Sequence, residues 1–346
     1  KVNFCKYTNE TRLSMEDASA NSGQRYIAGL NGIASGGGYE LPLACEEIYL
    51  VDDRRSAVAL PEVPYLGVLP GTGGLTRVVD KRKVRRDLAD MFCSSADGVK
   101  ADRAKQWGLV DASATPNRFP ELVRERAESL AVGSIRPRRA EGIKLGPLKR
   151  RVQDDGIFYE HVDARIDQAS RTVTITVRAP VGLQPSTLES IHAAGDAWWP
   201  LAMARELDDC ILMLRTNEAD LGLWVLKTSG DSDAVIAASG VLSSRREDWL
   251  VRETVGLLRR TFARLDVTSR SLYAIIDQGS CFAGVLLELA LAADRIYMLS
   301  LLDGDDNAPA ITLHEANFGL FPAVNHQSRL ETRYYGDKVS LERVRG

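Results

Sequence analysis

Two stretches of this chain, about 250 residues apart, have the form of one strand, loop and helix that occurs twice. The first runs from Ile27 to Leu41 and the second from Ile275 to Leu289. The offset at the helix glutamates Glu40 and Glu288 is 248 residues (288 − 40). Self-similarity at a fixed offset is the sequence mark of a duplicated fold. The sequence therefore predicts two domains built on the same plan.

Only the first copy keeps a full run of glycines in its loop. Gly36, Gly37 and Gly38 occupy the turn before the first helix, whereas Val285 and Leu286 stand where the second copy would need two of them. Glycine lets bare backbone approach a ligand closely, and a Cβ atom at the same place crowds it. We therefore expect the first copy to be catalytic and the second to be a degenerate scaffold.

Length and composition describe an ordinary globular protein. The 346 residues carry a formal net charge of −3 and are 45% hydrophobic, so nucleic acid is not an expected partner. The five cysteines show no CxxC spacing, which is typical of reduced thiols in the cytoplasm. The four histidines form no paired motif, so no metal is expected, and no apolar run is long enough for a membrane.

The order of expected elements favours the α/β class. A strand at 26–30 runs into the glycine turn, a helix follows at 39–45, and a buried strand returns at 48–51. Residues 119–132 have apolar positions at helical spacing. Residues 158–166 and 172–177 read as a hairpin.

Three segments follow from these patterns. Residues 1–132 form the expected catalytic domain, residues 133–152 are rich in arginine, glycine and proline as a linker tends to be, and residues 153–346 form the second domain. With the repeat as a measure, about 94 residues are expected upstream of the first copy and about 38 or more downstream of the second. The sequence thus predicts that both domains are truncated.

Three linked motifs in the first copy resemble the crotonase (enoyl-CoA hydratase/isomerase) superfamily. They are Asn31 to Leu41 with its glycine run, Pro61-Glu62 at the end of an expected strand, and Leu66 to Gly74, which reads Leu-Gly-Val-Leu-Pro-Gly-Thr-Gly-Gly. The element Trp107-Gly108-Leu109-Val110 follows in the right order. The resemblance implies a spiral of ββα units, present here as two tandem crotonase-like domains.

The duplication and the run from Val2 to Arg12 resemble more closely the ring-cleaving branch of aerobic benzoate degradation. That resemblance implies a lyase that opens the ring of 2,3-epoxybenzoyl-CoA with two waters and releases formate. Coenzyme A would be part of the substrate, and no cofactor is implied. Hydration of another enoyl-CoA, or a non-catalytic binding subunit of the same fold, remains an alternative.

The resemblance also implies the roles of single residues. The Gly37 N–H would donate to the thioester oxygen, and Glu40 and Glu62 would form an acid/base pair because two carboxyls in one apolar pocket titrate apart. Cys5 aligns with a position of the ring-cleaving branch, although an inert thiol is an equal alternative. Without the motif, each glutamate would read as a surface residue and the glycines as a tight turn.

The expected substrate contacts lie around the same motifs. They are Gly36, Gly38, Pro61, Gly67 and Gly71. Cys45 and Cys93 have apolar neighbours and are expected in the core. A homodimer is expected by analogy with the family alone.

Overall fold

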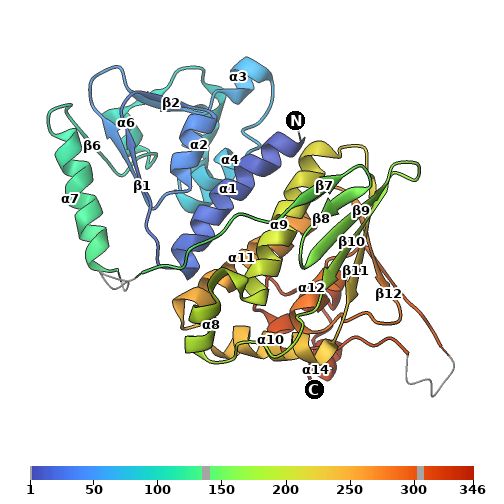
Figure 1. Ribbon diagram of the computed structural model, residues 1–346. Helices are drawn as coiled ribbons and strands as arrows, with labels where there is room; N and C mark the ends of the chain where they lie inside the picture. Colours follow the sequence, from blue (N-terminus) through green and yellow to red (C-terminus); the bar gives the residue numbers. More distant parts are fainter. Residues whose placement is uncertain (1, 135–140, 302–307) are drawn as a thin grey trace. The chain divides into compact units, whose positions relative to one another are not determined.

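A computed structural model of the chain describes residues 2–134, 141–301 and 308–346, and the side chains from residue 6 onward (Figure 1). It divides into two compact units, Lys1–Ala140 and Glu141–Gly346. Both units combine helices with sheets, so the α/β class is confirmed. The division falls inside the predicted linker 133–152, of which residues 135–140 lie outside the described residues.

Over residues 2–134, the described part of the first unit, the chain forms two three-stranded sheets and the helices packed on them. Its elements are α1 (Val2–Asn21), β1 (Ile27–Leu30), β2 (Ile33–Ser35), α2 (Gly37–Leu43), β3 (Glu47–Val51), β4 (Ala57–Ala59), α3 (Glu62–Leu66), α4 (Gly74–Thr76), the π-helical turn η1 (Arg77–Lys81), α5 (Arg86–Ser94), β5 (Val99–Lys100), α6 (Ala101–Gln106), β6 (Ala112–Ala114) and α7 (Phe119–Val132).

Strand β3 lies in the centre of the sheet β1-β3-β6, and its residues are buried accordingly. Its residues Ile48, Tyr49, Leu50 and Val51 are all at most 4% exposed, as a strand covered on both faces requires. It pairs in parallel with β1 on one side and with β6 on the other, and α7 packs across this sheet through Phe119 (Figure 1). The second sheet has β4 between a parallel β2 and an antiparallel β5.

In its described residues, 141–301 and 308–346, the second unit has one larger sheet with helices. Its elements are β7 (Arg151–Gln153), β8 (Gly156–Phe158), β9 (Val162–Asp167), β10 (Thr172–Arg178), α8 (Leu188–Ala194), the 3₁₀ turn η2 (Gly195–Ala197), α9 (Trp199–Asn217), β11 (Leu223–Ser229), α10 (Ser232–Ser244), α11 (Trp249–Asp266), β12 (Ser271–Ile276), α12 (Gly284–Leu291), β13 (Arg295–Met298), the 3₁₀ turn η3 (Glu315–Phe318), α13 (Arg329–Arg333) and α14 (Lys338–Arg345).

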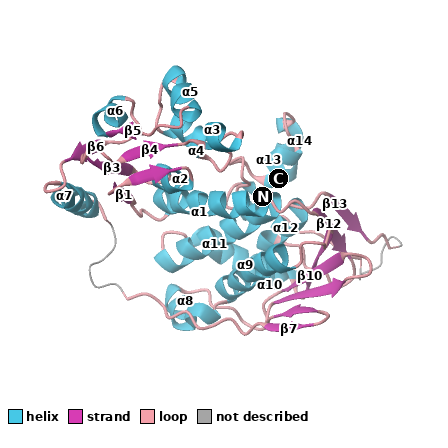
Figure 2. Ribbon diagram, turned by 90° about the horizontal axis from the view of Figure 1, so that it is seen from above, coloured by secondary structure: helices cyan, strands magenta, loops and turns pink. Residues whose placement is uncertain are grey.

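Seven strands lie in the order β13-β12-β11-β10-β9-β8-β7. The strands β10 to β13 are parallel and β7 to β10 are antiparallel. Alternate residues of β10 and β11 are buried, so one face of the sheet carries the core. The helices α9, α10, α11 and α12 lie beside the sheet on the side of that core (Figure 2).

The predicted elements agree with the structure in segments where apolar residues recur regularly over many positions. The helix 119–132 has the bounds of α7, and the hairpin is β9 with β10. One expectation was wrong: Glu62 lies not at a strand end but at the start of α3, because Pro61 cannot donate to a strand ladder and caps the helix. Among the described residues, every helix is too short or too polar to cross a membrane.

Candidate active site

The glycine loop joins β2 to α2 in the first unit. Gly36 has φ 55° and ψ −126°, a conformation that side chains rarely adopt, and its N–H donates to the Ala59 carbonyl at 2.9 Å. Gly37 begins the helix, so its N–H has no acceptor within it. A Cβ atom at Gly38 would meet nothing within 4 Å. The loop therefore presents backbone to open space, as the predicted role of Gly37 requires.

Glu40 follows one turn later and is almost fully enclosed. Its side chain is 1% exposed. Its Oε2 accepts the Thr72 hydroxyl and lies 3.1 Å from Nη2 of Arg12, while its Oε1 accepts the Gly74 N–H at 3.0 Å. Both oxygens of the carboxylate thus have partners.

Arg12 is the buried counter-charge of this carboxylate. It lies on α1, is 4% exposed, and its Nη1 donates to the Thr72 carbonyl at 2.8 Å. Burial lowers the pKa of Arg12, and the charge of Glu40 opposes that shift. The guanidinium therefore joins α1 both to α2 and to the loop that contains Thr72.

Glu62 has a different environment at the start of α3. It is half-buried, and its Oε2 has no hydrogen-bond partner among the described residues. Burial raises the pKa of Glu62, its own backbone N–H opposes the shift, and the charge of Glu40 adds to it. A Cβ atom on Gly36 would lie 3.0 Å from Glu62 Oε1. The structure therefore brings this carboxyl to the glycine loop, within electrostatic reach of Glu40.

Of two cysteines considered for the site, Cys93 lies near Glu62, and the side chain of Cys5 lies outside the described residues. Cys93 on α5 is 5% exposed, and burial with the charge of Glu62 raises the pKa of its thiol to about 11. It is a neutral neighbour of Glu62, and its predicted place in the core is confirmed. Cys5 belongs to α1, but its side chain lies outside the described residues, so its role stays a prediction.

The other predicted substrate contacts, Pro61, Gly67 and Gly71, lie at the two ends of α3 and in the loop that follows it. Pro61 caps α3, and Gly67 ends it with φ 64°. Gly71 lies next to Thr72. Sequence reasoning missed Arg12 as a partner of Glu40, because its position on a mostly polar helix gives no signal of burial. Among the described residues, no group of three or more His, Cys, Asp or Glu side chains could hold a metal ion.

The equivalent place in the second unit is filled by its own side chains. The Val285 N–H, at the position of the Gly37 N–H, donates to Oγ of Ser239 at 2.9 Å. Glu288 is 1% exposed, and its oxygens contact Asn317 Nδ2 at 2.7 Å and Arg329 Nη1 at 2.9 Å. From the sequence we expected the Val285 side chain to crowd a bound ligand. The structure shows in addition that the Ser239 hydroxyl already accepts the hydrogen bond of the Val285 N–H.

We expect Glu288→Gln to leave catalytic turnover within about twofold of the wild type, because Ser239 occupies the Val285 amide and the Glu288 side chain is only 1% exposed. The same change should lower the thermal midpoint, since a neutral amide replaces a buried charge partner of Arg329. Steady-state kinetics and a melting curve on the same preparation check both parts. Loss of turnover in a variant that melts like the wild type would contradict the assignment.

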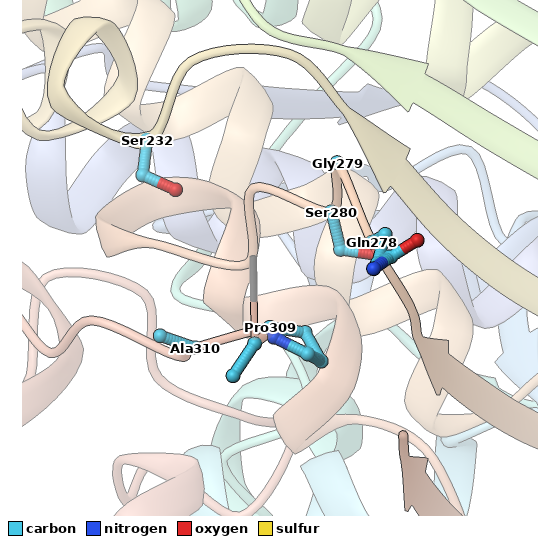
Figure 3. A pocket seen from close by; sticks show the side chains of 7 residues that line it. Ser232, Gln278, Gly279, Ser280, Pro309 and Ala310 are labelled. Atoms are coloured by element: carbon cyan, nitrogen blue, oxygen red, sulfur yellow. The ribbon is translucent and has the colours of Figure 1, made fainter. Parts of the chain in front are cut away.

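A separate pocket of about 560 Å³ lies in the second unit (Figure 3). Its lining comes from the start of α10, the loop after β12 and the segment 308–310: Ser232, Gln278, Gly279, Ser280, Ala308, Pro309 and Ala310. The hydroxyl of Ser280 is already bonded to Asp277 Oδ1 at 2.9 Å. We assign this pocket no catalytic role.

Part of the chain matches a family model, and the whole chain is similar to a known lyase. Residues 7–140 match the family model described as enoyl-CoA hydratase/isomerase, so this part of the chain is similar to the crotonase family. The whole chain is 56% identical over 345 residues to the benzoyl-CoA-dihydrodiol lyase of Aromatoleum evansii. It covers 62% of that relative's length.

Two further proteins are similar to part of the chain. The fatty acid oxidation complex subunit alpha of Acinetobacter baumannii (strain SDF) is 32% identical over 129 residues, which are 36% of this chain and 17% of that protein. The crystal structure of an enoyl-CoA hydratase from Mycobacterium tuberculosis H37Rv is 32% identical, with 32% of this chain and 42% of that chain covered and a TM-score of 0.29.

Proposed function

We propose that the polypeptide opens the ring of 2,3-epoxybenzoyl-CoA. Two waters are consumed, and 3,4-dehydroadipyl-CoA semialdehyde and formate are released, as a step of aerobic benzoate degradation. The observation that carries the proposal is the half-buried Glu62 carboxyl, with one oxygen unpartnered among the described residues, beside the glycine loop. The 56% identity to a benzoyl-CoA-dihydrodiol lyase supports this substrate over other CoA thioesters.

The backbone of Gly37 polarises the thioester in this proposal. Its N–H donates to the carbonyl oxygen as negative charge builds there, and one such donor contributes about 2.7–4 kcal/mol to the stability of a transition state. The polarised thioester then serves as an electron sink for the ring. The open space at Gly38 supports an approach of the acyl group from that side.

Glu62 moves the proton in the same proposal. A carboxyl whose pKa is raised by burial exchanges protons close to neutral pH more readily than an exposed one. Together with Glu40 it activates water and protonates the oxygen of the epoxide, and coenzyme A enters as part of the substrate. A homodimer in the cytoplasm, without a resident cofactor, completes the proposal.

The second unit is proposed as a second crotonase-like module. The bridge between Ala283 and Thr312 supports this, because it stands where β2 and β4 pair Ser35 with Ala59 in the first unit. The arrangement of α11, β12, α12 and β13 repeats that of α1, β1, α2 and β3. The module would serve as scaffold.

Product analysis with the intact polypeptide tests the reaction. Formate should form from 2,3-epoxybenzoyl-CoA, and crotonyl-CoA should remain unhydrated. Hydration of crotonyl-CoA without formate from the epoxide would replace ring cleavage by the simpler reaction. A thermal midpoint that responds to no acyl-CoA would favour a non-catalytic subunit instead.

A further inference from the structure

The turn that carries Gly37 and the start of α2 form one backbone unit. The Gly36 carbonyl accepts the N–H groups of Tyr39 and Glu40, both at 2.9 Å. Gly37 and Gly38 lie inside this turn, between the carbonyl and its donors. A contact that fixes Tyr39 therefore also fixes the direction in which the Gly37 N–H points.

Helix α2 is too short to fix this turn by itself. It has seven residues, Pro42 lies within it, and no side chain caps its first N–H groups. Isolated helices shorter than about 12–15 residues are marginal in water, so tertiary contacts must hold a helix of this length. Tyr39 makes such a contact, because it is 0% exposed and its ring packs edge-on against Phe92 of α5, with the ring centres 5.8 Å apart.

The Tyr39 hydroxyl adds a directional bond to this packing. It donates to the Leu109 carbonyl at 2.6 Å, across 70 residues of sequence. Burial raises the pKa of Tyr39, so the hydroxyl stays protonated at neutral pH and can donate. Leu109 is also buried, so neither group can turn to water instead. Because a buried polar group without a partner is costly, the bond fixes both of its ends.

The acceptor lies in a turn that is itself tied to β3. Gly108 has φ 77°, a conformation that favours glycine, and its carbonyl accepts Nε of Arg82 at 2.9 Å. The Asp111 carboxylate accepts both a bond from Arg82 Nη1 at 2.9 Å and the Ile48 N–H of β3 at 2.7 Å. The turn is therefore fixed to the sheet, and the Tyr39 hydroxyl fixes α2 to the turn.

The second unit lacks the hydroxyl. At the offset of 248 residues Leu287 stands opposite Tyr39 (287 − 39), and it is 1% exposed. Leucine fills the core but cannot donate a hydrogen bond. The phenol thus occurs in the unit whose glycine loop is open, and leucine occurs in the unit where Ser239 occupies the amide of Val285. Packing alone would be served by either side chain, which favours a role of the hydroxyl beyond packing.

We infer that Tyr39 is a positioning residue for the Gly37 N–H, and that the turn from Trp107 to Val110 is its anchor. The bond from Tyr39 to the Leu109 carbonyl holds the first turn of α2 against the sheet, so the amide keeps its direction when a thioester oxygen binds. This inference rests on the proposed function. It also gives the element from Trp107 to Val110, known so far only as a sequence motif, a part in the reaction.

Tyr39→Phe in the intact polypeptide tests the inference, because it removes the hydroxyl and keeps the ring. We expect kcat for 2,3-epoxybenzoyl-CoA to fall by about 10- to 100-fold, since a misplacement of about 1 Å can cost 10²-fold. KM should change less than kcat, because the amide acts mainly on the charge that builds in the transition state. The carbonyl stretch of bound benzoyl-CoA should move back toward its position in free benzoyl-CoA.

Tyr49→Phe is the matched control. Tyr49 on β3 is 4% exposed, and its hydroxyl contacts Glu47 and Arg126 instead of the turn that holds α2. The change removes the same atom from the same unit. This variant should keep the kcat and the carbonyl band of the wild type, even where its thermal midpoint falls. Equal losses of kcat in the two variants would contradict the inference.

Gly108→Ala reaches the same bond from its anchor and serves if Tyr39→Phe does not fold. A Cβ atom at Gly108 would lie 3.7 Å from the Arg82 carbonyl oxygen, so it fits in space, but φ 77° disfavours a side chain and strains the turn. This variant should lower kcat with Tyr39 intact. Hydrogen exchange at the amides of residues 39 and 40 should become faster in Tyr39→Phe and Gly108→Ala and stay unchanged in Tyr49→Phe, because it requires the turn at Gly36 to open.

Two results would overturn the inference. One is a Tyr39→Phe variant that melts lower than the wild type but keeps its kcat and its carbonyl band, because the hydroxyl would then serve the fold alone. The other is unchanged exchange at residues 39 and 40 in both Tyr39→Phe and Gly108→Ala. If the wild type turns over no acyl-CoA, the proposed function fails on its own, and the exchange measurement still decides whether Tyr39 positions the turn around Gly37.

Discussion

Glu62→Gln should lower kcat by about 10³-fold, because a positioned acid or base contributes 10²–10⁴-fold and an amide cannot exchange the proton. The pocket should remain intact, since glutamine has the shape of glutamate. Formate release from 2,3-epoxybenzoyl-CoA is the activity to measure, and the affinity for benzoyl-CoA should change little.

The folded state should not suffer from the same change. Burial raises the pKa of Glu62, so its ionised form is disfavoured in the folded protein and its contribution to stability falls as pH rises through the raised value. At pH 7 the neutral glutamine lacks this cost, and the thermal midpoint should be unchanged or higher. A lowered midpoint would point to a structural role instead.

The exposed Glu315 supplies a matched control. It stands in the second unit where Glu62 stands in the first, and Glu315→Gln removes the same carboxyl from the unit proposed as scaffold. Its turnover should match the wild type. Equal losses in the two variants would assign chemistry to the second unit and contradict the proposed division of labour.

Arg329→Met should cause the largest loss of stability in the second unit. Arg329 is 3% exposed and pairs with Glu288 at 2.9 Å and with Asp266 at 2.9 Å. Removal of one partner from a buried ion pair leaves an uncompensated charge and costs about 3–5 kcal/mol. For a unit of this size we expect the thermal midpoint to fall by roughly 6–20 °C.

The loss should depend on pH in a defined direction. Burial raises the pKa of Glu288 and of Asp266, and Arg329 opposes both shifts. Without the guanidinium both pKa values rise further, so the variant loses stability as pH increases through the raised values. Its defect should therefore be smaller at pH 5 than at pH 8.

The same substitution at an exposed arginine is the control. Arg165 lies 3.8 Å from Asp155, and both side chains are more than 60% exposed. Exposed pairs contribute about 0–1 kcal/mol, so Arg165→Met should melt near the wild-type midpoint. If Arg329→Met melts no lower than Arg165→Met, the buried cluster does not stabilise the second unit.

Long periodic segments and glycine motifs were readable from the sequence. Helix α7 was predicted with its observed bounds, because its apolar positions recur at helical spacing. The run of glycines predicted the turn at Gly36, and the backbone there has a conformation that favours glycine. The burial of Cys45 and Cys93 followed from their apolar neighbours.

The partners of the buried carboxyls could not be read in the same way. Arg12 and Glu40 are 28 residues apart (40 − 12), and an arginine on a polar helix reads as a surface residue until the fold covers it. Ser239 likewise gives no sign that its hydroxyl meets the Val285 N–H, 46 residues away. Such contacts depend on tertiary packing, which local patterns do not encode.

The carbonyl stretch of bound benzoyl-CoA, labelled with ¹³C at the thioester, tests the central claim most directly. Infrared difference spectra on the intact polypeptide should show this band at lower wavenumber than in free benzoyl-CoA, because the Gly37 N–H draws electron density to the oxygen. Gly37→Val should lose both the shift and turnover. A bound thioester whose carbonyl band stays at its solution position would contradict the account.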